Sequence, residues 1–349
     1  MEPIIRHWVW LLLVWCAAGD IAPAFAAPGD CQVVRAPGKF ESKGESAETA
    51  ATPGNRGIVP PGFVALADGT SVVHGIDVSK WQSSADFIRV VEFGGRFAYV
   101  RLSAGRNPDN ELEYRSHWAN ARSVRLLVGP YHNLTLVDPS PIFASLANRD
   151  QQRVVEQNVA SAREQASLLM QRLREVLLLD PLPPDGSTGM LGLAYLPIVL
   201  DASARPQMNG SAADRKVFGM AYRAAICTWM TAIRSTWTFN NQPIMLFTLP
   251  TVYAEYDLNA LPCMTSDAPI WISHRDDDGR RALDDPRPEM RSAITALCKP
   301  NGSTDRCLFE QYTSWGGFAL FQKDEGLDLN RFFGTEEQLR ALLQHANRR

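Results

Sequence analysis

The chain has 349 residues, of which 45% are hydrophobic and 21% are charged, so it carries enough apolar material for one large globular domain. Its formal net charge is -3 and its pI is about 6.1, which excludes the basic surface expected of a nucleic-acid-binding protein. These bulk numbers otherwise name no function.

The N-terminus has the pattern of a secretory signal. Arg6 precedes an apolar run over residues 8–18, and Ala24-Phe25-Ala26 follows with small residues at the two positions that a signal peptidase reads. A membrane anchor is the alternative, but a bilayer span needs about 20 apolar residues and this run is shorter. We therefore expect residues 1–26 to be a signal peptide. The mature protein is expected to be periplasmic or secreted and to have no membrane span after processing.

The next segment, residues 27–70, is rich in Ala, Gly, Pro, Ser, Thr and Glu, and predicts a disordered leader. From residue 71 onward, short apolar runs alternate with helical patterns. The expected strands are residues 72–78, 97–102, 126–132, 196–201, 243–248, 269–272, 308–313 and 326–329. Helical patterns lie near residues 85–93, 114–123, 150–179 and 213–235.

This alternation is typical of parallel strands joined by crossover helices, and eight strands suggest a closed barrel. We predict an α/β fold over residues 71–349, a single β/α (TIM-like) barrel whose irregular last strands lack full helices. The amphipathic pattern of residues 150–179 fits an outer barrel helix better than a partner-binding helix. Nothing indicates an oligomer, and we expect a monomer.

The cysteines resemble disulfide partners rather than metal ligands. Cys298 and Cys307 flank a turn-rich stretch and are expected to pair, and Cys227 with Cys263 is a second candidate pair. Cys31 is left over in the leader. No Cys or His cluster has the spacing of metal ligands, so we expect neither a metal nor another cofactor.

Three of the expected strands carry an aspartate. In parallel barrels the active site lies at the carboxyl ends of the strands. Asp77 and Asp201 follow apolar runs, and Asp328 lies in the last expected strand. A carboxylate there is costly unless it is paired or used. Each aspartate alone fits a capping role, but three on separate strands favour a common site.

Seven motifs, in order between residue 74 and about residue 335, resemble those of glycoside hydrolase family 25, the muramidases or Chalaropsis-type lysozymes. Residues 75–82 (GIDVSKWQ) resemble its opening signature and residues 128–132 its V-G-x-Y-H strand. The other matches are residues 97–105, 197–201, 270–272, 311–314 and 328–332. The resemblance implies a β/α barrel that cleaves the β-1,4 bond after N-acetylmuramic acid in peptidoglycan.

The chain departs from this family at the proton donor. The family carries a glutamate two residues after the aspartate of its fourth strand, on the same strand face, but this chain reads Asp201-Ala202-Ser203. A serine hydroxyl is not a usable acid near neutral pH. Glu310, which stands at the position of a family tryptophan, is a candidate for a relocated acid. The acidic run at residues 276–278 is another, although such runs are usually solvated loops.

Two hypotheses therefore stand. The first is an exported muramidase with altered acid catalysis, and the second is a catalytically lapsed barrel that binds cell-wall glycan. Peptidoglycan or a related N-acetylated glycan is the expected partner in both. The expected catalytic residues are Asp77, Asp201 and Glu310, and the expected substrate-binding residues are Tyr99, Tyr131, His132, Ser203, Trp271, Tyr312 and Asp328.

Overall fold

The computed structural model describes residues 63, 69–82, 85–137, 148–179, 194–203, 212–236, 243–265, 268–273, 297–298, 306–316 and 327–345. The chain divides into two compact units, Met1–Arg35 and Ala36–Arg349, and every described residue belongs to the second. The expected signal peptide and Cys31 lie outside the described residues. So does most of the expected leader and the acidic run at residues 276–278. Among the described helices, none is both long enough and apolar enough to span a membrane.

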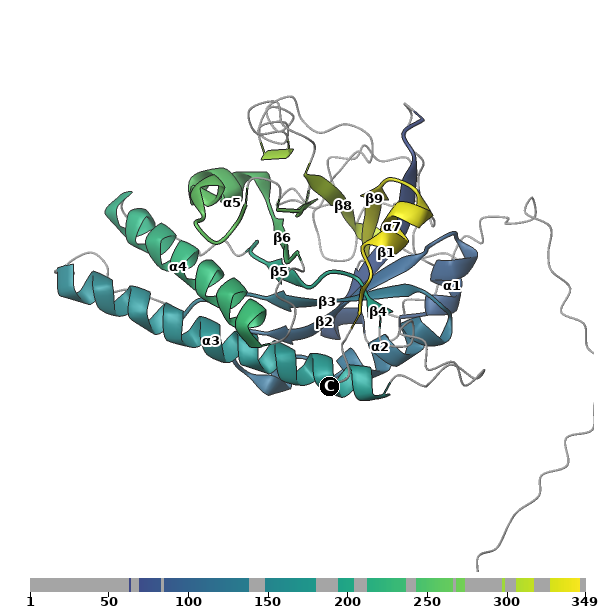
Figure 1. Cartoon of the computed structure of the whole chain (residues 1–349), viewed down its shortest axis with the longest axis horizontal. Coiled ribbons are helices and arrows are strands. Elements are labelled where there is room, and N and C mark those ends of the chain that lie inside the picture. Colours follow the sequence, from purple (N-terminus) through teal and green to yellow (C-terminus); the bar gives the residue numbers. More distant parts are fainter. Residues whose placement is uncertain are drawn as a thin grey trace, which may run out of the picture. The chain divides into compact units, whose positions relative to one another are not determined.

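Eight strands close into a barrel (Figure 1). From β1 to β8, each strand of the barrel is parallel to the next. The last strand, β9, is antiparallel to both β8 and β1. This architecture confirms the predicted α/β barrel with irregular last strands. In barrel order the strands are β1 (Val72–Val78), β2 (Phe97–Ala104), β3 (Leu127–Asn133), β5 (Val199–Asp201), β6 (Met245–Thr248), β7 (Ile270–Ser273), β8 (Cys307–Gly316) and β9 (Leu327–Phe333).

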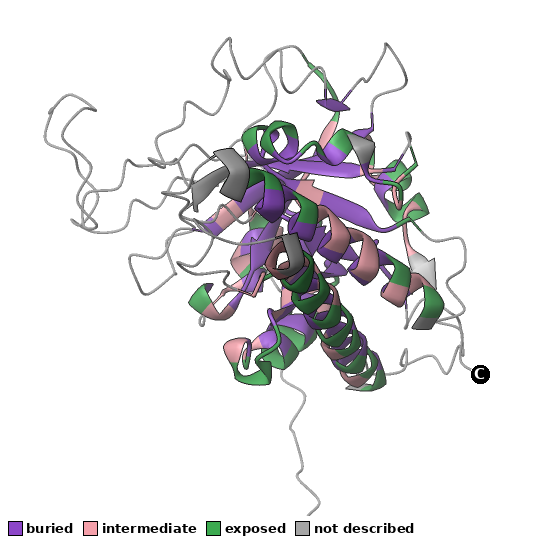
Figure 2. Cartoon of the chain, turned by 90° about the vertical axis from the view of Figure 1, so that its left-hand side faces the viewer, coloured by how far each residue is buried: buried purple, intermediate pink, exposed green. Residues whose placement is uncertain are grey.

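Helices supply the crossovers that parallel strands need. Among them α3 and α4 pack together along one side of the barrel (Figure 1), which confirms that residues 150–179 form an outer helix. Helices carry buried residues on one side and exposed residues on the other (Figure 2). The helices are α1 (Phe87–Glu92), α2 (Tyr114–Ser123), α3 (Asn148–Leu179), α4 (Ala212–Thr236), α5 (Pro250–Glu255) and α7 (Glu336–Ala341), with short 3-10 turns η1 (Lys80–Gln82), η2 (Pro108–Asn110) and η5 (Leu258–Ala260).

Strand alternation separates two hydrophobic cores, because successive residues of a strand point to opposite faces. The outer core, which includes Ile76, Val100 and Leu200, packs between the strands and the helices. The inner core fills the barrel with large side chains, and glycines make room for them. A Cβ on Gly129 would lie 2.3 Å from Tyr99 Cε1. The inner core consists of Val73, Phe97, Tyr99, Leu127, Tyr131, Leu196, Val199, Met245, Trp271, Phe309, Phe332 and Leu339.

The C-terminal part of the described chain covers the amino-terminal end of the barrel strands. After β9, α7 contributes Leu339 to the inner core. The short strand β10 (Gln344–His345) then pairs antiparallel with β4 (Ala194–Tyr195). The opposite end of the barrel, where the parallel strands finish, carries the polar residues described below.

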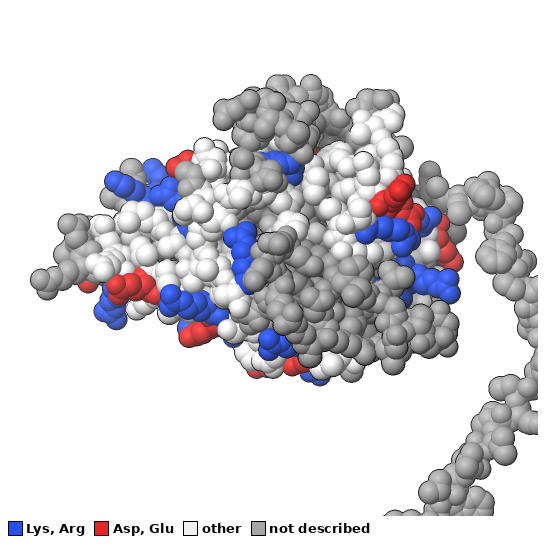
Figure 3. Space-filling view, in the orientation of Figure 1, with Lys and Arg blue, Asp and Glu red and all other residues white. Residues whose placement is uncertain are grey.

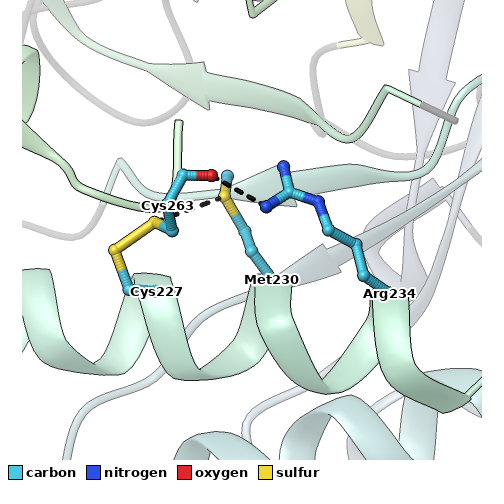
Figure 4. Close-up of a disulfide and its surroundings, with 4 residues drawn as sticks. All are labelled: Cys227, Met230, Arg234 and Cys263. Atoms are coloured by element: carbon cyan, nitrogen blue, oxygen red, sulfur yellow. Dashed lines mark hydrogen bonds between the residues drawn. A yellow bond between two sulfur atoms is a disulfide. The ribbon is translucent and has the colours of Figure 1, made fainter. Parts of the chain in front are cut away.

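Two disulfides join the outer parts of the barrel, and both are the predicted pairs. Cys227 of α4 is bonded to Cys263, which follows η5. Figure 4 shows this bond beside Arg234, whose guanidinium donates a hydrogen bond of 2.8 Å to the Cys263 carbonyl oxygen. Cys298 is bonded to Cys307 at the start of β8.

Removing the Cys227–Cys263 bond is expected to lower the free energy of unfolding. The bond closes a loop with a sequence separation of 36 residues, and constraining such a loop in the unfolded chain is worth about 2–4 kcal/mol. A Cys227→Ala/Cys263→Ala variant, compared with wild type by urea unfolding, checks this value. The Cys298–Cys307 bond spans only 9 residues, so its removal is expected to cost less. Equal losses would contradict the loop-length argument.

Candidate active site

Three strands bring Asp77, Asp201 and Asp328 to one end of the barrel. Asp201 ends β5, and Asp77 lies one residue before the end of β1. Asp328 lies near the beginning of β9, but that strand is antiparallel to its neighbours, so its beginning meets their ends. Asp77 is directly opposite Asp328 in the register of β1 and β9. All three expected aspartates therefore share one site, and Asp201 also acts electrostatically on Asp77.

The Asp77 carboxyl group is buried and surrounded by hydrogen-bond donors. Asn330 Nδ2 donates to its Oδ2 at 2.8 Å, and Gln311 Nε2 donates to the same oxygen at 3.3 Å. The Tyr131 hydroxyl donates to Oδ1 at 3.4 Å. Burial raises the pKa of Asp77 well above its usual range, and the charge of Asp328 raises it further, while the Asn330 bond opposes the shift.

The Asp201 carboxylate is held by two donors of a different kind. Asn133, directly opposite it in the register of β3 and β5, donates from Nδ2 to Oδ2 at 2.6 Å. The backbone N–H of Ser203 donates to Oδ1 at 3.0 Å. Two hydrogen bonds to separate oxygens fix the orientation of the carboxylate. Ser203 thus supports Asp201 through its backbone.

An ion pair that sequence reasoning missed lies beside these aspartates. Arg101, on the inner face of β2, is opposite Tyr131 in the register of β2 and β3 and forms an ion pair with Glu111. The backbone N–H of Lys80 donates to Glu111 Oε2 at 2.9 Å. Burial raises the pKa of Glu111, and Arg101 opposes that shift. The sequence signal for Arg101 is its spacing of two from Tyr99, which predicts the same strand face. Glu111, in a loop, has no such signal.

Glu310 lies on the other side of the β8 pleat. Its neighbour Gln311 reaches Asp77, so Glu310 points to the outer face. There it forms a buried ion pair with Arg331, directly opposite it in β9. This placement does not support the relocated-acid role that the sequence suggested for Glu310.

Of the four expected aromatic residues, Tyr131 is the one whose polar group contacts Asp77. Tyr99 and Trp271 fill the barrel below the site, with ring centroids 4.7 Å apart and exposures of 0% and 2%. Tyr312 packs in the outer core, with the Arg331 guanidinium 5.2 Å from its ring centroid. The structure therefore brings Tyr131 to the aspartates and places the other three rings elsewhere.

His132 also lies on the outer face, between the barrel and the two long helices. Its Nε2 is 2.9 Å from Gln165 Oε1 of α3 and its Nδ1 is 2.8 Å from Ser103 Oγ of β2. Because Gln165 Oε1 can only accept, Nε2 carries the proton and Nδ1 accepts from Ser103. The ring stacks on Trp229 of α4 with centroids 5.6 Å apart. Burial lowers the pKa of His132 to about 4.

This buried histidine predicts a loss of stability in mild acid. Its pKa is lower in the folded chain than in the unfolded chain, where it is about 6.5. The contribution of neutral His132 to the free energy of unfolding is therefore complete above pH 6.5. It is lost as the pH falls toward 4, and the loss reaches at most about 3 kcal/mol. Urea unfolding at several pH values should give a shallower pH dependence in His132→Gln than in wild type. Parallel curves would contradict the prediction. His74, whose pKa burial also lowers to about 4, titrates equally in both proteins.

Comparisons with known proteins agree with the motifs. Residues 76–149 match the family model of glycosyl hydrolases family 25. The sequence is 36% identical over 63 residues to Lysozyme M1 of Streptomyces globisporus. That match covers 18% of this chain and only 21% of the relative's length. The resemblance derived from the motifs is confirmed.

Solved structures of similar proteins include a family 25 glycosyl hydrolase from Bacillus anthracis, with a TM-score of 0.48 and 17% identity, covering 82% of this chain and 99% of that chain. A bacterial lysozyme from Streptomyces coelicolor has a TM-score of 0.47 and 20% identity, covering 78% of this chain and 97% of that chain.

Proposed function

We propose that this chain, a relative of glycosyl hydrolases family 25 through residues 76–149, is a glycoside hydrolase that cleaves peptidoglycan. The observation that carries the proposal is the convergence of three aspartates from β1, β5 and β9 at the end of the barrel where active sites of such folds lie. Its matched relative from Streptomyces globisporus is a lysozyme. The bond cleaved is the β-1,4 linkage after N-acetylmuramic acid.

The chemistry needs one group that protonates the leaving oxygen and one that stabilises the charge developing on the sugar ring. An N-acetylated sugar can supply its own nucleophile, the carbonyl oxygen of its acetamido group. Asp201 suits the supporting role, because Asn133 and the Ser203 N–H hold its carboxylate in a fixed orientation. In that orientation Asp201 accepts a hydrogen bond from the acetamido N–H and stabilises the positive charge that forms.

The proposed site of action is outside the cytoplasm, in the periplasm or beyond. The signal pattern of residues 1–26 supports export. Two disulfides are typical of an oxidising compartment. On the described part of the face in Figure 3, acidic and basic side chains are interspersed, a pattern that gives no support to a nucleic-acid partner.

The test is incubation of the protein with purified peptidoglycan, followed by borohydride reduction and mass spectrometry of the fragments. Reduced N-acetylmuramic acid at the new ends is expected, whereas reduced N-acetylglucosamine would identify a different glycosidase. A Ser203→Glu variant run in parallel tests the second hypothesis, a catalytically lapsed barrel that binds cell-wall glycan. The serine at that position favours this hypothesis. A wild type that binds peptidoglycan but forms no new ends, together with cleavage by Ser203→Glu, would identify a lapsed glycan-binding barrel.

A further inference from the structure

The carboxyl groups of Asp77 and Asp328 face each other across the antiparallel pair β1 and β9. Residues directly opposite in such a pair have Cβ atoms about 4.5–5.5 Å apart, and like charges there repel. Asp77 is only 6% exposed, so water screens this repulsion poorly. A single proton shared between the two carboxyl groups removes most of it, as it does in other paired carboxylates.

The charges around the pair also favour a retained proton. Asp201 and Asp328 both act on Asp77 as like charges. Arg101, on the inner face of β2, is already paired with Glu111. Lys80 lies beside that glutamate, with its ammonium 5.0 Å from the centroid of the Trp81 ring. The combined effect of burial and Asp328 is a pKa of Asp77 well above its usual range.

The Asn330 side chain gives independent evidence that a ligand belongs next to Asp77. Asn330 is completely buried, and its Nδ2 donates to Asp77 Oδ2. Its Oδ1 is buried and has no hydrogen-bond partner among the described residues. Buried acceptors are nearly always paired in folded proteins. A hydroxyl or amide N–H of a bound sugar beside Asp77 would satisfy this acceptor.

Resting on the proposed function, we propose that Asp77 and Asp328 together hold the proton that protonates the leaving glycosidic oxygen, in place of the glutamate that this chain lacks. The pair contacts the reacting atoms through Asp77, which Asn330, Gln311 and Tyr131 orient. Asp328 acts as a positioning residue that keeps the proton on the pair.

The resulting reaction balances in two steps. In the first, the bond between C1 and the glycosidic oxygen breaks, its electron pair goes to that oxygen, and the proton of the carboxyl pair moves there too. The acetamido carbonyl oxygen bonds to C1, while Asp201 accepts a hydrogen bond from the acetamido N–H. In the second, water attacks C1, the bond from the acetamido oxygen breaks, and a proton from the water returns to the pair.

The test compares two substrates that differ in their need for an acid. Cleavage of peptidoglycan requires protonation of the leaving sugar, whereas an N-acetylglucosamine oligosaccharide with a nitrophenol leaving group does not. Asp77→Asn is expected to lower kcat on peptidoglycan by about 10²–10⁴-fold and to affect the nitrophenyl substrate far less. Adding Ser203→Glu to Asp77→Asn should recover part of the lost activity, because it supplies a new carboxylic acid beside Asp201.

The Asp328→Asn variant distinguishes a proton-holding role of the carboxyl pair from a purely structural role. Losing a like charge lowers the pKa of Asp77, so the alkaline limb of the pH–rate profile should move to lower pH. Infrared spectra at neutral pH should contain a protonated-carboxyl band that is absent in Asp77→Asn, a readout independent of activity. Thermal unfolding of each variant establishes that it is folded.

The results distinguish the two proposals. A wild type that cleaves peptidoglycan, with equal losses on both substrates in Asp77→Asn and no protonated-carboxyl band, overturns the proton-donor role and leaves the proposed function standing. A wild type without cleavage of either substrate overturns the proposed function. An unchanged pH profile in an active Asp328→Asn variant overturns the role of Asp328.

Discussion

An Asp201→Asn variant is expected to cleave peptidoglycan at least about 100-fold more slowly than wild type, which is the usual loss when one preorganised electrostatic contact is removed. Asparagine has nearly the same shape, so the fold should survive. Its amide carries no negative charge to stabilise the reacting acetamido group. It would also turn an NH₂ group toward one of the two donors that now bind Asp201, Asn133 Nδ2 or the Ser203 N–H.

The measurement is the rate of reducing-end formation on purified peptidoglycan, with Asp257→Asn as the matched control. Asp257 is exposed, and its ion pair with Arg223 is a surface contact. Its backbone is left-handed, with φ 52°, a conformation that asparagine tolerates. The control should keep wild-type activity. Wild-type activity in Asp201→Asn would remove Asp201 from the reaction.

The order of strands and helices was predictable from the sequence because each strand of a parallel barrel is buried on both faces. Such strands appear as short apolar runs between helical patterns. The aspartates that end β1 and β5 stand out against those runs. Asp328 also stands out, but its presence at the same end depends on β9 running antiparallel. That direction depends on a pairing with β1, more than 240 residues earlier, and no local pattern encodes it.

The face on which a residue lies was the part that the sequence could not predict. A strand that is apolar on both sides shows no alternation to read, and a slip of one residue exchanges the two faces. The structure has such a shift between Ile270 and Trp271, and another between Arg101 and Ser103. His132 and Tyr312 lie outside the barrel, whereas Gln311 and Asn133, which sequence reasoning had not selected, lie inside it.

Side chains alternate along β8, so Glu310 lies on the outer face and is expected to have a structural role. A stability measurement tests this role. Glu310 and Arg331 form a buried pair on the outer face, with side-chain exposures of 2% and 9%. Glu310→Gln leaves the Arg331 charge buried without its partner, which typically costs about 3–5 kcal/mol of unfolding free energy. Urea unfolding measures that loss.

Replacing both partners of this pair provides the control. A Glu310→Leu/Arg331→Met variant removes both charges together and is expected to recover most of the stability, because apolar side chains of similar size often replace a buried ion pair without loss. Arg331 also packs against the rings of Tyr312 and Phe333, contacts that methionine can retain. Both variants should keep wild-type kcat per folded molecule, since neither side chain faces Asp77. A Glu310→Gln variant of normal stability that cleaves peptidoglycan 100-fold more slowly would instead place Glu310 in the reaction.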